Sequence, residues 1–428
     1  MQPLALLCGS PRRFLLLICL GWLTPGSLAR PTPLAQEYTI AYHNPDSEYY
    51  VAGVGFERFD DGTLLGVVPV IPRPAWNLER RATHSRTHIV SSRDGGRTWE
   101  RLATLPYYSA VPWIHEGKLH LFVHKGGSDV RSRDVLLLRS EDRGRNWSPE
   151  RLLFGGQFWN SHTAVWVRHQ TLYYAMDDLA LDPNRGLRLL AGDLSMDPMD
   201  HRAWRLSEPL AFPGLPAALV PAGRSGGTRL YSEPNVIEVQ GKLRLLAGVN
   251  AEAQATAGLG AVIDVEDDGR EMRLSFAQFH PAPGAQVKRA IIWDEVSQLY
   301  WATANLAVDS QEAFDWWEKA RSAGTFVGGG GNDRRFLMLL YSVDGLNWIQ
   351  AGCIAQAAQL SQSFMYARPV IDGDDLAILV RASISAPNQH DADFATFHRV
   401  KRFRQLALEL VPQSATSERP TKPPGRIN

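Results

Sequence analysis

Cysteine is scarce in this sequence, with 3 in 428 residues. Cys8 and Cys19 lie in an N-terminal segment that we expect to be cleaved off, so the mature chain keeps only Cys353. One cysteine cannot form an intramolecular disulfide or supply a cysteine-based zinc site. We therefore expect the fold to depend on its buried core.

An excess of either charge sign is also absent, because 45 Lys and Arg balance 45 Asp and Glu. A nucleic-acid-binding protein normally shows a basic excess, so we predict no nucleic-acid partner. Sustained helical periodicity is missing as well. The 36 Gly and 13 Trp instead favour an all-β fold with many tight turns and aromatic packing.

The chain lacks an apolar run long enough to span a membrane comfortably. Arg12 and Arg13 precede the run Phe14–Leu23, and small residues follow at 27–29, which is the layout of an export signal. We predict a signal peptide over 1–35, a secreted or periplasmic protein, and no stable membrane span after signal removal. A short membrane anchor is the alternative. The tail 412–428 is rich in Pro, Ser, Thr and Lys and is predicted to be disordered.

Two familiar motifs are missing: the Rossmann glycine pattern and His-Glu-x-x-His. We predict no cofactor and no metal. A polar cluster at Asn388–Asp393 leaves one alternative open, since His390 with Asp391 and Asp393 could bind a metal or relay a proton. These residue types are also ordinary turn formers.

A short turn motif occurs three times, at Ser92–Trp99, Ser140–Trp147 and, one residue shorter, Ser342–Trp348. Its Ser and Asp can accept or donate hydrogen bonds at nearby backbone groups, its Gly supplies positive φ, and its Trp covers the turn. Each copy precedes a strand-like segment. The motif therefore predicts a repeated hairpin unit.

Between these turns, one pattern recurs: a β-rich run, a turn with Gly or Asp, and a second β-rich run. We count six such units. Their long spacing is typical of four-stranded propeller blades rather than of helical or leucine-rich repeats. The units are 55–70, 112–123, 163–176, 235–248, 289–303 and 368–381.

The three turns resemble the Asp boxes of the sialidase (neuraminidase) superfamily, and the resemblance covers about residues 40–408. It implies an all-β, six-bladed propeller of the sialidase type over 36–411. In that family, a Tyr nucleophile is activated by a Glu, three arginines bind the substrate carboxylate, and an Asp is the acid/base. On this pattern Tyr366 resembles the nucleophile, Glu233 its base and Arg334 the last clamp arginine.

The chain departs from this pattern in three places. No Arg stands around Val51–Phe56 or at Gly248–Asn250, and the loop Pro72–His88 has no Asp. Glu79 or His84 in that loop would be the replacement acid/base. Further substrate-binding candidates enter the later units: His162, Arg289 beside Lys288, and Arg368, which could form a substitute anion clamp.

The resemblance implies an exo-glycosidase that retains anomeric configuration and acts on an acidic or polar glycan. Two alternatives remain open: a non-catalytic propeller that binds glycans or proteins, and a lyase that cleaves uronic-acid polysaccharides. The missing arginines and acid favour the first alternative. The propeller fold by itself does not decide among them.

Overall fold

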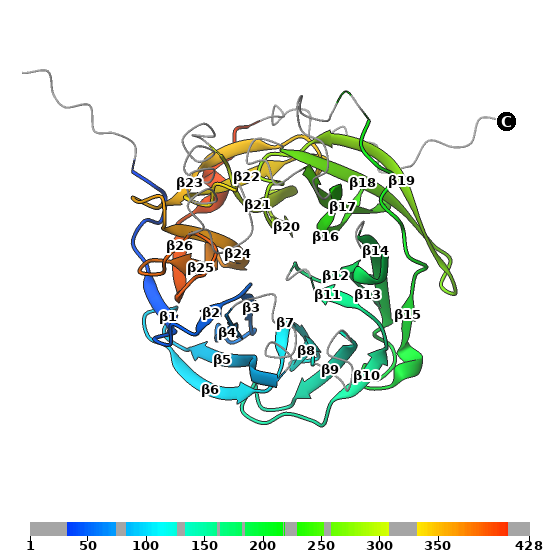
Figure 1. Ribbon diagram of the computed structural model, residues 1–428, viewed down its shortest axis with the longest axis horizontal. Helices are drawn as coiled ribbons and strands as arrows, with labels where there is room; N and C mark the ends of the chain where they lie inside the picture. The colour runs from blue at the N-terminus through cyan, green and yellow to red at the C-terminus, as the bar shows by residue number, and fades with distance from the viewer. Residues whose placement is uncertain are drawn as a thin grey trace, which may run out of the picture. The chain divides into compact units, whose positions relative to one another are not determined.

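Six antiparallel sheets follow one another around a ring in the computed structural model (Figure 1). The structure describes residues 32–73, 83–125, 133–160, 163–181, 185–216, 218, 229–251, 258–307 and 332–409. Each sheet is one blade, and its strands follow one another outward from the centre of the ring (Figure 1). The predicted all-β, six-bladed propeller is therefore confirmed.

The first three blades use consecutive strands. Blade 1 contains β2 (Tyr49–Val51), β3 (Gly55–Arg58), β4 (Leu64–Pro72), β5 (Arg86–Ser92) and β6 (Glu100–Leu105). Blade 2 contains β7 (Tyr108–His115), β8 (Lys118–His124), β9 (Val135–Ser140) and β10 (Arg151–Phe154). Blade 3 contains β11 (Phe158–Asn160), β12 (Trp166–Arg168), β13 (Thr171–Asp178), β14 (Gly186–Asp193) and β15 (Trp204–Leu206).

The last three blades complete the ring. Blade 4 contains β16 (Arg229–Val239), β17 (Lys242–Ala251), β18 (Leu259–Asp267) and β19 (Met272–Pro281). Blade 5 contains β20 (Ala290–Asp294), β21 (Leu299–Asn305), β22 (Phe336–Ser342) and β23 (Ile349–Gln356). Blade 6 contains β24 (Ser363–Asp372), β25 (Asp375–Ser383), β26 (Phe394–Val400) and β1 (Thr39–His43). Short 3₁₀ helices lie at η1 (Leu179–Leu181), η2 (His201–Ala203) and η4 (Phe403–Leu406).

The ring closes in blade 6, where strands from both ends of the propeller pair. Its outermost strand, β1, runs antiparallel to β26, with Thr39 opposite Phe397. Just before β1, the Leu34 and Ala35 amides donate hydrogen bonds to carbonyls of β23 in blade 5. The N-terminal strand therefore covers an edge that would otherwise be unpaired.

The core is divided among the interfaces between blades. Each of six hydrophobic clusters joins two neighbouring blades around the ring. Strands inside a blade bury both faces, and β4 is buried at every position, whereas the outer strand β6 is largely exposed. This explains why the inner strands read as continuous apolar runs rather than alternating ones.

The three turn motifs connect the third and fourth strands of blades 1, 2 and 5, as predicted. In the first, the Asp94 carboxylate accepts hydrogen bonds from the Arg97 and Thr98 amides at 3.0 Å and from the Thr98 hydroxyl at 2.6 Å. These bonds, with the Thr98 hydroxyl first, hold the pKa of Asp94 well below its usual range. The Ser92 hydroxyl accepts the Gly96 amide.

The shorter third motif keeps the carboxylate bonds and loses the Trp bond. Asp344 accepts the Asn347 side-chain amide at 2.6 Å, as Asp142 does with Asn146. Trp99 Nε1 donates to the Gly96 carbonyl at 3.1 Å, whereas buried Trp348 Nε1 has no partner among the described residues. Deleting one residue therefore shifts the ring away from the turn carbonyl.

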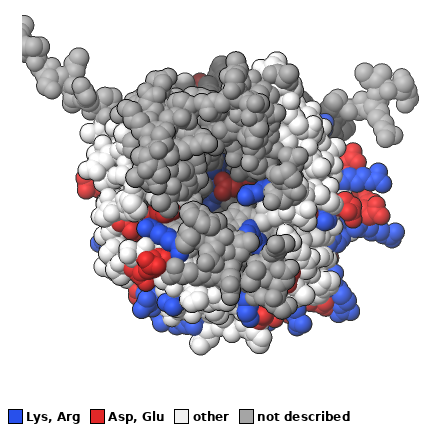
Figure 2. Space-filling view, in the orientation of Figure 1, with Lys and Arg blue, Asp and Glu red and all other residues white. Residues whose placement is uncertain are grey.

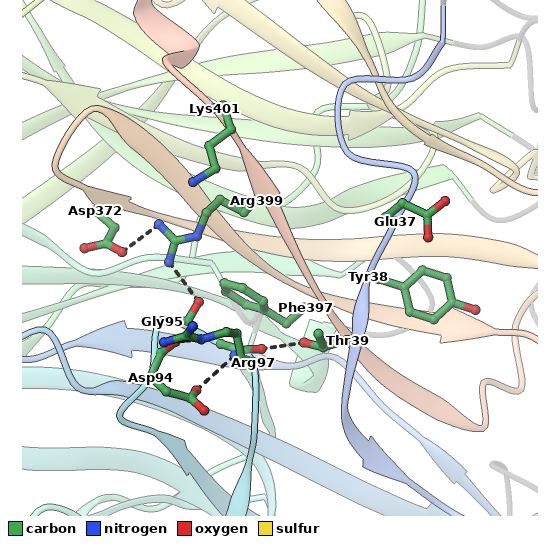
Figure 3. A pocket seen from close by; sticks show the side chains of 11 residues that line it. Glu37, Tyr38, Thr39, Asp94, Gly95, Arg97, Asp372, Phe397, Arg399 and Lys401 are labelled. Carbon is green, nitrogen blue, oxygen red and sulfur yellow. Dashed lines mark hydrogen bonds and ion pairs between the residues drawn. The ribbon is translucent and has the colours of Figure 1, made fainter.

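Each motif also packs against the preceding blade. A Cβ on Gly144 would lie 2.9 Å from Ile89 of blade 1, and one on Gly345 would lie 2.7 Å from Ile237 of blade 4. At the closing seam, Arg399 of β26 donates to the Gly95 carbonyl and pairs with Asp372, while Thr39 donates to Gly96 (Figure 3). The motifs therefore hold neighbouring blades together.

We expect Gly96→Ala to destabilise the propeller by more than about 2 kcal/mol. Gly96 has φ 92°, and a Cβ there would lie 2.1 Å from the Phe397 ring. Left-handed strain of about 1–3 kcal/mol then adds to overpacking of similar size. Gly117→Ala is the matched control, because Gly117 has φ 72° and open space around its Cβ. Urea unfolding should separate the two variants, and equal losses would contradict the packing role.

Candidate active site

A cavity of ≈ 120 Å³ lies where the inner strands of several blades converge. Figure 2 shows acidic and basic atoms in the hollow at the centre of this face. The cavity is mostly polar and aromatic rather than aliphatic. Its lining residues are Tyr50, Ala52, Gly53, Ile71, Trp159, Glu233, Lys288, Tyr366, Arg381 and His390.

The predicted nucleophile and base both occupy left-handed backbone in bulged inner strands. Tyr366 and Glu233 each have φ 49°. The pairing register shifts between Met365 and Arg368 in β24 and between Ser232 and Asn235 in β16. Ser109 has φ 51° at the matching bulge of β7. Such strain in non-glycine residues costs about 1–3 kcal/mol and is concentrated at functional sites.

Tyr366 is surrounded by cations. Its ring centroid lies 5.3 Å from Lys288 Nζ, 5.7 Å from Arg334 Cζ and 5.0 Å from Arg381 Cζ. Burial raises the pKa of Tyr366, the Glu233 carboxylate raises it further, and Arg334 opposes both. The hydroxyl is therefore neutral before reaction, in a field that favours developing negative charge.

The Glu233 carboxylate is close enough to Tyr366 to raise the pKa of its phenol. The two side chains, both in the described part of the chain, do not form a hydrogen bond with each other. Burial raises the pKa of Glu233, Lys288 opposes that shift, and Asp177 adds to it. Asp177 of β13 accepts the Glu233 amide at 3.1 Å and pairs with Arg185 at 3.2 Å. Asp177 therefore positions Glu233 and helps to keep it basic.

Three buried cations around this cavity have unused hydrogen-bond donors. Lys288 Nζ, Arg334 Nε and Arg381 Nε make no hydrogen bond to any described residue. Each of these three residues is 3% exposed. Burial lowers the pKa of Lys288, and the Glu233 carboxylate counters that shift. Because unpaired buried donors are costly, the cluster is suited to an anion that would satisfy them.

His390 also faces the cavity and is held by a carboxylate. Its Nδ1 lies 2.8 Å from Asp391 Oδ1, and Asp391 Oδ2 lies 3.5 Å from Arg73 Nε. Asp393 accepts instead from the Ile384 and Ser385 amides. The polar cluster predicted at 388–393 thus divides into a His390–Asp391 pair and a structural Asp393. No group of three metal-binding side chains occurs within the described ranges.

The other predicted residues lie outside the cavity lining. The Arg289 guanidinium is buried near His280. Burial and the Arg289 charge together lower the pKa of His280 to about 4. Arg368 lies 3.7 Å from Glu57, and burial raises the pKa of Glu57 to about 7. His84 is exposed and contacts Thr83. The remaining predictions fall outside the described residues: Glu79, His162, the tail at 412–428 and, of the signal predicted at 1–35, residues 1–31.

Sequence reasoning missed several residues around this cavity, namely Tyr50, Trp159, Asp177 and Arg381. Asp177 directly follows the apolar run Leu172–Met176, and Arg381 interrupts the apolar end of β25. A buried charge next to an apolar strand is a usable signal. The sequence does not tell where such a side chain points, because that depends on which blade lies beside the strand.

Comparisons with known proteins agree on the fold. No protein-family model and no curated protein matches the chain. An alpha-L-arabinanase from Penicillium chrysogenum, solved with arabinobiose, has 12% identity and a TM-score of 0.52 over 87% of this chain and 99% of that one. A Hadza microbial sialidase has 16% identity and a TM-score of 0.54 over 85% and 68%.

A Trypanosoma rangeli sialidase, in complex with 2,3-difluoro-KDN, has 15% identity and a TM-score of 0.56 over 88% of this chain. The chain spans 60% of that sialidase chain. This protein therefore has the six-bladed propeller fold shared by sialidases and an arabinanase. Within the part of the chain that the structure describes, no helix is long and apolar enough to cross a membrane.

Proposed function

We propose that this protein is a glycoside hydrolase that acts on an acidic glycan with retention of configuration. The observation that carries this proposal is the convergence of Tyr366 and Glu233, at matching bulges of two blades, on one cavity with three buried cations. The structural neighbours include sialidases and an arabinanase, which supports glycosidic chemistry.

The proposed mechanism follows from the charges in the cavity. A carboxylate nucleophile would be repelled by an acidic sugar, whereas the neutral Tyr366 phenol would not. As Tyr366 attacks the anomeric carbon, its proton passes to Glu233, whose raised pKa suits a base near neutral pH. Lys288, Arg334 and Arg381 provide donors for the acidic group of the sugar.

Incubation with acidic oligosaccharides tests this proposal. We expect release of a reducing sugar, and proton NMR should show that the first product keeps the anomeric configuration of the substrate. Inverted product would exclude a covalent Tyr366 intermediate. Saturable binding on a glycan array without any product after prolonged incubation would favour the non-catalytic binding propeller.

A lyase acting on uronic-acid polysaccharides is the second candidate. One observation favours it: burial lowers the pKa of both Lys288 and His390, which makes each a readier proton acceptor in the cavity that Tyr366 lines. Elimination would create a double bond in the product. A product that absorbs in the ultraviolet, with no net addition of water by mass spectrometry, would replace hydrolysis with elimination.

The pH dependence of hydrolysis should respond to Asp177. Glu233 must be ionised to accept a proton, so kcat/KM should fall as pH drops through its raised pKa. Asp177→Asn removes a neighbouring negative charge while an amide oxygen can still accept the Glu233 amide. We expect the fall of kcat/KM on the acidic side of its pH profile, the acidic limb, to move to lower pH. Asp178→Asn, which loses its partner Arg188 instead, is the control and should leave the limb in place.

A further inference from the structure

The structure leaves one role of the proposed reaction without a residue: the group that protonates the departing glycosidic oxygen. Tyr366 is the proposed nucleophile, and Glu233 is the base that activates it. The acid/base candidates from sequence were Glu79, which the structure does not describe, and His84, which is exposed and lies outside the cavity lining. Lys288 is assigned to the acidic group of the sugar, and His390, which also lines the cavity, has a ring nitrogen, Nε2, that is not engaged by Asp391.

We propose that His390 is the proton-transfer residue of this site and that Asp391 positions it. This proposal rests on the proposed hydrolase function. Asp391 engages His390 Nδ1 at 2.8 Å, so Nε2 is the nitrogen left to exchange a proton with a substrate. His390 Nε2 makes no hydrogen bond to any other described residue. The ring is also close to Tyr50, with centroids 5.5 Å apart.

The loop that carries His390 is fixed by hydrogen bonds on every side. Asn388 Oδ1 accepts the amides of His390 and Asp391, both at 2.8 Å. The His390 carbonyl accepts from the Arg381 guanidinium, and Gln389 Oε1 accepts the Arg334 amide at 2.8 Å. The loop therefore fixes the position of the His390 imidazole relative to Arg381 and Arg334, two of the cations around the Tyr366 ring.

Charge balance explains how the half-buried His390 imidazole becomes protonated. Burial, Arg381 and Arg334 lower the pKa of His390 to about 3, and Asp391 opposes them. Lys288 Nζ lies 5.3 Å from the centroid of the Tyr366 ring, and Arg73 pairs with Asp391. An acidic sugar would neutralise part of this positive field and raise the pKa of His390. Proton uptake would thus accompany substrate binding.

In the first step, the Tyr366 oxygen bonds to the anomeric carbon and gives its proton to Glu233. The bond to the leaving oxygen breaks, and that oxygen takes the proton from His390 Nε2. In the second step, water attacks the anomeric carbon and gives a proton to His390. The Tyr366–carbon bond breaks, and the phenolate recovers its proton from Glu233. The sum is addition of one water across the glycosidic bond.

The test compares leaving groups. His390→Gln should lower kcat/KM by roughly 10²–10⁴-fold on methyl glycosides of N-acetylneuraminic and glucuronic acid. On the 4-nitrophenyl glycosides it should lower kcat/KM less than about tenfold, since nitrophenolate departs without protonation. Asp391→Asn should show the same pattern more weakly. His115→Gln, a histidine outside the cavity, should match wild type on both substrates.

Each remaining outcome decides one question. Equal loss on both substrates with an unchanged Tm, or no loss on either, would overturn the role of His390 and leave hydrolysis standing. A leaving-group-dependent loss in Glu79→Gln and not in His390→Gln would assign the acid to Glu79 and overturn the proposal. No turnover of either substrate by wild type would overturn the proposed function itself, and His390 with it.

Discussion

Tyr366→Phe is expected to abolish turnover, with a loss of about 10⁴-fold or more, as is typical when a catalytic nucleophile is removed. The melting temperature should stay nearly unchanged. Phe keeps the ring among Lys288, Arg334 and Arg381, and the Tyr366 hydroxyl donates no hydrogen bond to any described residue. Both results are measured on the same preparation, by product release and by thermal unfolding.

Tyr300→Phe is the matched control for this experiment. The Tyr300 hydroxyl donates to the Glu238 carbonyl between blades 5 and 4, and neither residue lines the cavity. Losing that bond should cost about 1 kcal/mol of stability and leave kcat/KM unchanged. Turnover that survives Tyr366→Phe would exclude the nucleophile assignment. A large fall in stability in that variant would instead mark Tyr366 as a structural residue.

Lys288→Met is expected to stabilise the protein and weaken its binding of acidic sugars. Lys288 is 3% exposed, and its Nζ makes no hydrogen bond to any described residue, so the charge is costly in the free protein. A buried donor without a hydrogen bond costs about 1–3 kcal/mol, and an apolar side chain of similar shape removes that cost. Loss of a charged hydrogen bond should weaken acidic ligands by about 10- to 100-fold.

The measurements are urea unfolding and calorimetric titration with N-acetylneuraminic and glucuronic acid. Lys125→Met is the control, because Lys125 is half exposed and pairs with Glu150 at the surface, where substitutions change stability by about 0.5 kcal/mol or less. The removal of Lys288 should also raise the pKa of Glu233 and shift the acidic limb of kcat/KM upward. Reduced stability with unchanged binding would show that Lys288 serves the fold.

The repeated turns allowed much of this arrangement to be predicted. They fix which strands are third and fourth in blades 1, 2 and 5, and this register placed Tyr366 and Glu233 at the entrances of inner strands. The structure brings both to one cavity. Arg289 directly precedes β20 and Arg368 lies within β24, yet neither lines the cavity. Sequence position gives the strand, but the bulge and the neighbouring blade decide where the side chain goes.

The sequence by itself determined the number of blades, their hairpins and the turn chemistry, because each depends on residues close together in the chain. Tertiary structure alone decided the ring closure by β1 and the convergence of Lys288, Arg381 and His390 around Tyr366. These depend on contacts between segments far apart in sequence, fixed by how six blades pack. No local sequence pattern specifies these long-range contacts, so the cavity is recognised only in the closed ring.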